Sequence, residues 1–294
     1  MGLRNTTRLR ELLKRPGVLV APGVYDCVSA KLAERAGYEM ALLTGAGVAA
    51  SLLGVPDVGL LTLTELATQA RNICRAASLP ILADAETGYG NAINVMRTVR
   101  ELEAAGVAGL FIEDQVTPKR CGHFEGKELI SVEEMEGKIR AACEARRDPD
   151  LVLMARTDAR EVLGLDEAIG RARAYVAAGA DTIFIEAPHT DEELRRIGQT
   201  MNVPQLANLV EGGKTPLASV AELEAMGFKV VSFSGSLQRA AIRAMAEFLD
   251  VLKKEGSVAS LYPGHVVSLG ERSELLGLAA FYELERRFLP GKGT

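Results

Sequence analysis

Short aliphatic runs alternate with longer amphipathic patterns along the chain, and this alternation constrains the fold more than any other feature of the sequence. Eight of the runs have the length of a strand. They lie at 18–21, 40–45, 80–85, 109–114, 151–157, 182–187, 205–210 and 230–235. The runs are apolar throughout instead of alternating between apolar and polar residues, which is typical of parallel strands buried on both faces.

Helical patterns with clear start and end signals separate these runs. The segment 131–147 opens with Ser-x-x-Glu, a capping box, and the segment 91–106 closes with a glycine. Further helices are predicted at 62–78, 166–179, 190–201, 219–227, 237–256 and roughly 271–289. Eight strand–helix units predict an α/β protein with a (β/α)8 barrel. An open doubly wound sheet is the alternative, but no G-x-G-x-x-G fingerprint follows any strand.

The eight strand–helix units do not account for the C-terminal residues of the 294-residue chain. We therefore divide it into a barrel domain at 1–256 and a helical extension at 257–294. The apolar face of the terminal helix has no ninth strand to cover. This helix packs either against its own barrel or against a neighbouring subunit, and the residues alone leave both alternatives open.

Charge and composition exclude several classes of protein. The chain has 34 Lys+Arg against 39 Asp+Glu, a formal net charge of −5, which argues against a nucleic-acid partner. No apolar stretch approaches the roughly 18 residues of a membrane span, and the charged N-terminus lacks an apolar signal core. The 4 cysteines are too sparse for a disulfide framework. We expect a cytoplasmic protein without a membrane partner.

Polar side chains follow nearly every predicted strand, where catalytic groups of such barrels cluster. Carboxylates stand at the tips of strands three, four and six, whose ends carry Asp84 and Glu86, Glu113 and Asp114, and Glu186. Like charges in one mouth repel unless a cation lies among them, and oxygen ligands suit Mg²⁺ or Mn²⁺ better than zinc. The alternative for any one of these carboxylates is that it caps the helix that follows.

Two further strand ends carry groups suited to an anionic substrate. Arg156 lies at the end of strand five and fits bidentate capture of a carboxylate or phosphonate, unless it forms an internal ion pair with a neighbouring glutamate. Thr44, with the backbone N–H groups of Gly45 and Ala46, could hold a carboxylate or an oxyanion. These glycine-rich residues could equally serve a tight strand-to-helix turn.

The loop after strand four is the most specific local signal. It contains Lys119-Arg120-Cys121-Gly122-His123 and is polar and long enough to act as a lid. Cys121 stands between cationic residues and near a histidine, a setting that lowers the pKa of a thiol. We therefore expect Cys121 to be an acid/base group or a nucleophile, whereas the other three cysteines lie within helical patterns.

At these residues the sequence resembles the isocitrate lyase/phosphoenolpyruvate mutase superfamily over nearly its whole length. The matching motifs, in family order, are GVPDVG (54–59), ADAETGYG (83–90), IEDQVTPKRCGH (112–123), MARTDA (154–159) and NLVEGGKTP (208–216). The KRCGH segment is similar to that of the carbon–carbon lyases. The closest branch contains 2-methylisocitrate lyase, 2,3-dimethylmalate lyase and oxaloacetate hydrolase.

The resemblance implies roles for particular residues of this chain. Asp84 matches the principal Mg²⁺ ligand, and Asp57, Glu86 and Glu113 match acidic positions that reach the metal largely through water. The positions matching substrate contacts are Thr44, Gly45, Ala46, Gly122, Arg156, Glu186 and Asn208. The gating loop supplies Lys119, Cys121, Gly122 and His123, with Cys121 as proton donor to an enolate. The catalytic set is then Cys121, Lys119, His123, Glu113 and Arg156.

The implied activity is Mg²⁺-dependent retro-aldol cleavage of a 2-hydroxy di- or tricarboxylate, of the 2-methylisocitrate or 2-alkylmalate type. The alternatives are an oxaloacetate hydrolase or decarboxylase, a phosphonomutase, and a non-catalytic metabolite-sensing barrel. Three positions depart from the family pattern: Glu86 replaces Asp, Leu42 replaces an aromatic residue, and Phe111 replaces the histidine of methylisocitrate lyases. The family also implies a homotetramer built from dimers that swap the terminal helix.

Overall fold

A computed structural model describes residues 2–289 of the chain. It contains two compact units, one that ends at Gln238 and one that begins at Arg239. The two units are described separately below. No helix within the described residues is long and apolar enough to cross a membrane.

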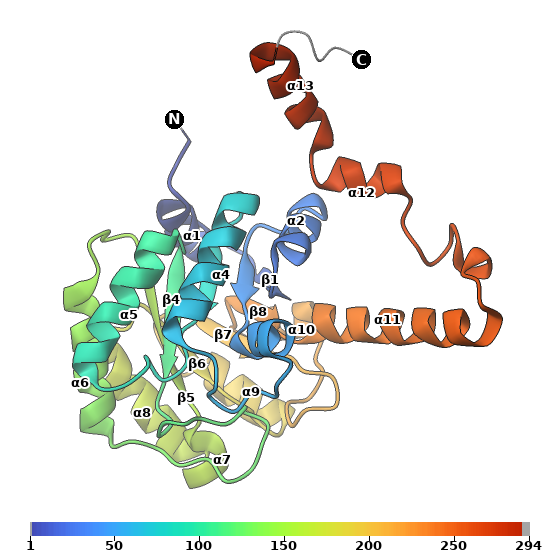
Figure 1. Ribbon diagram of the computed structural model, residues 1–294. Helices are drawn as coiled ribbons and strands as arrows, with labels where there is room; N and C mark the ends of the chain where they lie inside the picture. The colour runs from blue at the N-terminus through green and yellow to red at the C-terminus, as the bar shows by residue number, and fades with distance from the viewer. Residues whose placement is uncertain (1, 290–294) are drawn as a thin grey trace. The chain divides into compact units, whose positions relative to one another are not determined.

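The first unit is a closed barrel of eight parallel strands in which each strand pairs with its neighbour in the sequence (Figure 1). The strands are β1 Leu19–Val24, β2 Ala41–Leu43, β3 Ile81–Asp84, β4 Gly109–Glu113, β5 Val152–Thr157, β6 Thr182–Ile185, β7 Gln205–Asn208 and β8 Val230–Phe233. Pairing of β1 with β8, from Leu19 opposite Val230, closes the barrel. The eight predicted strands and the predicted barrel are confirmed.

Helices surround these strands, as Figure 1 shows for α4, α5, α6 and α8. Their bounds are α1 Asn5–Lys14, α2 Cys27–Arg35, α3 Gly45–Val48, α4 Leu63–Ala76, α5 Ala92–Ala105, α6 Val132–Ala145, α7 Ala159–Leu163, α8 Leu165–Ala177, α9 Asp191–Gly198 and α10 Val220–Met226. A π-helical turn, Ala49–Leu53, follows α3. The predicted signals act as expected: Ser131 caps α6, and Gly106 ends α5 in a left-handed conformation.

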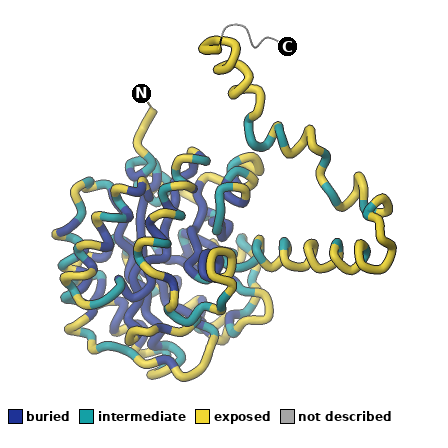
Figure 2. Tube along the Cα trace, in the orientation of Figure 1, coloured by how far each residue is buried: buried dark blue, intermediate teal, exposed yellow. Residues whose placement is uncertain are grey.

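The apolar core has two layers, which form the dark blue centre of the first unit in Figure 2. The larger layer lies between the strands and the outer helices, and the smaller one fills the inside of the barrel. Leu9 of α1 belongs to the inner layer, beside the first residues of strands β1 and β8, Leu19 and Val230. Helix α1, which the sequence analysis did not identify, therefore closes the amino-terminal end of the barrel.

The chain continues as helix α11, Ser236–Glu255, which crosses the boundary between the units. The second unit also contains a 3₁₀ turn, Ala259–Leu261, and helices α12, Leu269–Leu275, and α13, Leu278–Phe288. The single terminal helix predicted at 271–289 is wrong, because Gly277 adopts a left-handed conformation, with φ of 75°, and separates α12 from α13. Residues 290–294 of the predicted extension lie outside the described residues, and its boundary at 256 stays a prediction.

Candidate active site

A cavity of about 130 Å³ opens at the carboxyl ends of the barrel strands. Most of the predicted site residues line it, and these are Thr44, Ala46, Asp57, Asp84, Cys121, Gly122, His123, Arg156, Glu186 and Asn208. Four predicted residues are not part of the wall: Gly45, Glu86, Glu113 and Lys119. Closure of the barrel brings together groups that are far apart in the sequence, as expected for this fold.

Asp84, at the end of β3, is held by two backbone groups. Its Oδ1 atom accepts a hydrogen bond from Glu86 N at 3.0 Å, and its Oδ2 atom accepts one from Gly45 N at 3.3 Å. A Cβ at Gly45 would collide with Glu86 Oε1 and lie 3.1 Å from Asp84 Oδ2, so only glycine fits there. The N–H of Gly45 is therefore engaged by Asp84, and Ala46 is the member of this pair that faces the cavity.

Lys119 reaches back from the lid into the acidic cluster. Its Nζ atom lies 2.5 Å from Asp57 Oδ1 and 3.1 Å from Glu86 Oε2, and its side chain is buried. Burial raises the pKa of Glu86 to about 8; the charges of Asp84 and Asp57 raise it as well, and Lys119 opposes the shift without reversing it. Glu86 also has a φ of 54°, a conformation costly for a residue with a side chain and concentrated at functional sites.

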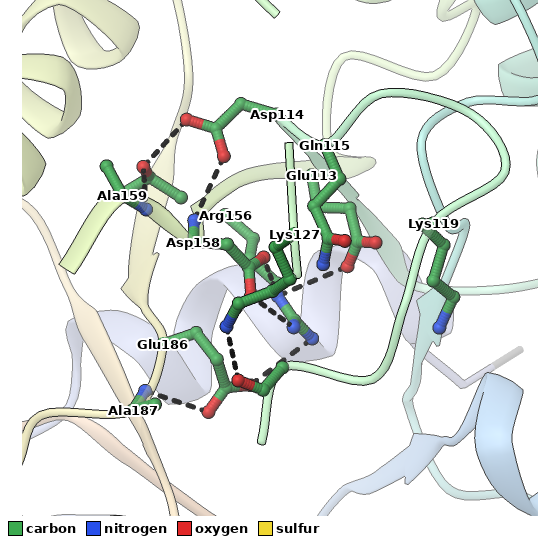
Figure 3. A network of polar contacts seen from close by, with 12 residues as sticks. Glu113, Asp114, Gln115, Lys119, Lys127, Arg156, Asp158, Ala159, Glu186 and Ala187 are labelled. Atoms are coloured by element: carbon green, nitrogen blue, oxygen red, sulfur yellow. Dashed lines mark hydrogen bonds and ion pairs between the residues drawn. The ribbon is translucent and has the colours of Figure 1, made fainter. Parts of the chain in front are cut away.

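Arg156 is surrounded by three carboxylates (Figure 3). Its Nε and Nη2 atoms donate to Asp158 at 2.9 and 3.0 Å, a bidentate pair, and Nη1 lies 3.3 Å from Glu186 Oε2. Nε also lies 3.2 Å from Glu113 Oε2. The internal ion pair considered as an alternative is therefore present. Because a guanidinium has five N–H groups, donors on Nη1 and Nη2 remain for a ligand in the cavity.

The lid segment, defined here as residues 116–128, is closed at its base by a hydrogen bond from Val116 N to Glu128 O of 2.8 Å. Burial raises the pKa of the Cys121 thiol to about 11. The expectation of a lowered pKa is therefore wrong. Lys119 turns away to the acidic cluster and Arg120 donates to Glu125 O, so neither cation stabilises a thiolate. Cys121 is a protonated thiol at neutral pH.

His123 is held in one neutral form. Burial lowers its pKa, and the neighbouring charges of Arg156 and Lys127 lower it further against the opposing effect of Glu186. Its Nδ1 atom accepts a hydrogen bond from Lys214 N at 3.2 Å, which assigns the ring proton to Nε2. Nε2 lies 3.6 Å from Glu186 Oε1. The ring therefore presents a donor toward Glu186.

One part of the cavity wall is apolar. Its members are Leu42, Phe111, Phe184 and Val210. The rings of Phe111 and Phe184 pack edge to face, with 5.9 Å between their centroids. The Cζ atom of Arg156 lies 5.1 Å from the centroid of the Phe184 ring, within range of a cation–π interaction. Next to this wall, Asn208 Oδ1 accepts a hydrogen bond from Ser232 Oγ at 2.9 Å, which directs the amide nitrogen away from that serine.

Sequence reasoning assigned no role to two residues of the site, Asp158 and Asp114. Asp158 anchors Arg156, and its pKa is lowered to about 2, because Arg156 and Lys127 outweigh the effect of burial. Asp114, fully buried, accepts hydrogen bonds from Tyr175 OH at 2.8 Å and from Asp158 N at 2.9 Å. The MARTDA motif contained Asp158 two residues after Arg156, and this spacing was the available signal.

The charges around the cavity fit a divalent cation. Among the described residues around the cavity, six carboxylates are paired with three cations: Asp57, Asp84, Glu86, Glu113, Asp158 and Glu186 with Lys119, Lys127 and Arg156. Glu113 Oε1 is buried and has no hydrogen bond within the described residues, and burial raises the pKa of Glu113 well above its usual value. No three metal-binding side chains within residues 2–289 are arranged to hold an ion directly. Mg²⁺ commonly binds through one or two carboxylates and keeps several waters, which agrees with this arrangement.

Comparison with known proteins places the chain in a class of enzymes. Residues 9–252 match the family model of phosphoenolpyruvate phosphomutase. The chain is 47% identical to 2,3-dimethylmalate lyase of Eubacterium barkeri, over 99% of this chain and 100% of the relative. It is 46% identical to 2-methylisocitrate lyase of Aeropyrum pernix, over 95% and 88% of the two chains.

Solved structures of related enzymes have the same fold as this chain. Oxaloacetate acetylhydrolase bound to the inhibitor 3,3-difluorooxalacetate superposes with a TM-score of 0.92 at 37% identity, covering 96% of both chains. Phosphonopyruvate hydrolase in complex with oxalate and Mg²⁺ gives a TM-score of 0.89 at 32% identity, covering 98% of this chain and 100% of the other. The chain belongs to the phosphoenolpyruvate mutase/isocitrate lyase superfamily, as the sequence motifs indicated.

Proposed function

We propose that this protein is a Mg²⁺-dependent carbon–carbon lyase that cleaves a 2-hydroxy dicarboxylate by retro-aldol chemistry. The observation that carries the proposal is the thiol of Cys121, which lines the cavity, is buried, and keeps its proton at neutral pH because its pKa is raised to about 11. A carbanion or enolate formed in the cavity needs such a proton donor. Neither a phosphoryl transfer nor a purely structural cavity needs one.

The acidic cluster holds the metal in this proposal. Asp84 would hold Mg²⁺, with Asp57, Glu86 and Glu113 as the further acidic residues around it. The ion would supply Lewis-acid polarisation of the substrate oxygens. Mn²⁺ could replace it at the same oxygen ligands.

The chain's own residues then carry out binding and proton transfer. Thr44 and the backbone of Ala46 hold the 2-hydroxy carboxylate end, and the free N–H groups of Arg156 bind the second carboxylate. A buried carboxylate takes the hydroxyl proton, and the bond between C2 and C3 breaks. C2 becomes the carbonyl carbon of a 2-oxo acid, and C3 keeps the electron pair as an enolate. Cys121 Sγ donates its proton to C3.

The apolar wall favours an alkyl group over a third carboxylate on the substrate. Phe111 and Phe184 occupy the wall next to Arg156, and Arg156 is the only lysine or arginine among the residues described as lining the cavity. A third carboxylate would be buried without a cation of its own, which is costly. Among the two substrate types considered, this supports a 2-alkylmalate more than 2-methylisocitrate.

A screen of five acids with Mg²⁺ tests the proposal. The panel contains 2,3-dimethylmalate, 2-methylisocitrate, isocitrate, oxaloacetate and phosphonopyruvate, and the release or loss of keto acid is followed. Pyruvate release from 2,3-dimethylmalate, abolished by chelation of the metal, is the expected result. Formation of acetate and oxalate, or of CO₂, from oxaloacetate alone would replace the lyase with a hydrolase or a decarboxylase. Turnover of phosphonopyruvate alone would indicate phosphonate chemistry, and no turnover with no Mg²⁺ binding would indicate a sensor.

We also propose that the C-terminal helices mediate assembly into a helix-swapped homotetramer in the cytoplasm. Helix α11 exposes Ile242, Met245 and Leu249, which recur at helical spacing on one face. Helix α13 exposes Phe281 and Phe288. Exposed apolar faces of this kind mark interfaces. Sedimentation of the whole chain, expected at four times the monomer mass, tests the assembly.

A further inference from the structure

Lys127 occupies an unusual place at the far end of the lid segment. Its side chain is fully buried, and it is not among the residues that line the cavity. Its Nζ atom donates to the carbonyl oxygen of Gly122 and to Asp158 Oδ1, the latter at 3.2 Å. Figure 3 shows Lys127 together with Asp158 and Arg156. A buried ammonium is expensive unless it is paired, so the two contacts are coupled to lid closure.

The first contact fixes the middle of the lid. Gly122 lies between Cys121 and His123, so its carbonyl oxygen controls the backbone that presents both side chains to the cavity. The fit there is tight, because a Cβ at Gly122 would lie 2.5 Å from Arg156 Nη2. The lid can reach this position only with glycine at 122 and with its carbonyl oxygen turned toward Lys127.

The second contact reaches the substrate-binding arginine. Asp158 accepts from Lys127 and at the same time holds the guanidinium of Arg156 through two hydrogen bonds. Lys127 and Arg156 together neutralise the negative charge of Asp158, a carboxylate that is fully buried. The position of Arg156 therefore depends on an ammonium that arrives with the lid.

We infer that Lys127 is a positioning residue that latches the lid segment shut and, through Asp158, orients Arg156 only when the lid is closed. The effect of this latch on catalysis rests on the proposed lyase function. The latch itself, which is the pair of contacts made by Lys127, does not depend on that function. Binding of a ligand and closure are thereby coupled, because an open lid leaves Arg156 as the one cationic partner of Asp158 among residues 2–289.

Alkylation of Cys121 tests the latch without any substrate. Lys127→Met removes both contacts at nearly constant length, and Lys127→Gln, which keeps a donor but no charge, serves as the second variant if the first does not fold. The whole chain is treated with iodoacetamide at pH 8, and each cysteine is followed by peptide mass spectrometry. We expect Cys121 to react at least about tenfold faster in either variant than in the unaltered protein, because loss of a charged hydrogen bond releases the lid.

Two controls separate a latch from a general loss of structure. Cys74 on α4 lies outside the lid and should react at an unchanged rate in the same samples. Lys138→Met removes another buried lysine, whose Nζ donates to Thr87 O at 3.2 Å, and should leave the Cys121 rate unchanged. Equal Cys121 rates with and without Lys127, or a joint rise of Cys121 and Cys74, would overturn the inference.

Kinetics separate failure of the latch from failure of the proposed function. With an active substrate, we expect kcat to fall at least about tenfold in Lys127→Met, by more than KM rises, because Arg156 and Cys121 are misplaced in the transition state. Lys127→Arg should recover part of kcat by restoring a cation at Asp158. An inactive protein whose Cys121 still becomes exposed in the variant would refute the lyase and retain the latch.

Discussion

The pH dependence of Cys121 alkylation is the most direct test of the proposed proton donor. Burial raises the pKa of the thiol from 9.0 to about 11, with no cation near enough to reverse the effect. The thiolate fraction falls tenfold for each pH unit below the pKa. At pH 8 the thiolate of Cys121 should therefore be about 100-fold scarcer than that of an unperturbed thiol, and only the thiolate reacts with iodoacetamide.

The assay measures the second-order rate of carbamidomethylation of Cys121 from pH 7 to pH 10, resolved by peptide mass spectrometry. The lid reduces the absolute rate at every pH, but it does not move the midpoint of the profile. We expect the logarithm of the rate to rise with a slope of one, without a plateau up to pH 10. A plateau reached below pH 9 would mean that Cys121 is a stabilised thiolate, which would refute its assignment as an acid.

Four further predictions follow from the site. Cys121→Ser should lower kcat about 10²- to 10⁴-fold, the usual contribution of a proton donor, with unchanged Mg²⁺ affinity by calorimetry; near-normal turnover would refute the role. Phe111→His should shift the ratio of kcat/KM toward a tricarboxylate about tenfold, since a polar group replaces an apolar one. Because the pKa of Glu86 is about 8 and that of Glu113 is also raised, Mg²⁺ binding at pH 7 should release at least about one proton and tighten as the pH rises to 8. Calorimetry in two buffers measures this, and no proton release would contradict the raised pKa values. Tyr175→Phe should cost about 1.5–3 kcal/mol in urea unfolding, because its phenol donates to a buried carboxylate, whereas the exposed Tyr282→Phe should change stability by less than about 0.5 kcal/mol.

The barrel could be predicted because its signals are local. A strand buried on both faces must be apolar throughout, and runs such as 109–114 show this without any knowledge of their neighbours. The capping of α6 by Ser131 is likewise encoded within four residues. Helix α1 was missed because its buried Leu9 has meaning only against the inner end of the barrel, far away in the sequence.

The sequence predicted which residues form the site better than it predicted their protonation states and ion-pair partners. Strand ends converge in a closed barrel, so the carboxylates, Arg156 and the lid cysteine could be brought to one mouth from the order of the strands alone. The ion-pair partner of each charged side chain could not be predicted from that order. The local sequence places cations beside Cys121, yet the structure sends Lys119 to Asp57 and Glu86, and the thiol pKa rises instead of falling.

The sequence by itself therefore determined the fold, the family and the end of the barrel at which the predicted site residues gather. These depend on periodicity and on residue types at strand ends, which are properties of short segments. Only the tertiary structure decided the protonation of Cys121, the anchoring of Arg156 by Asp158, and the contacts of Lys127 with both Gly122 and Asp158. The physical reason is that burial and charge pairing depend on residues that folding brings together, and the pKa of a group is set by those neighbours and not by its position in the chain.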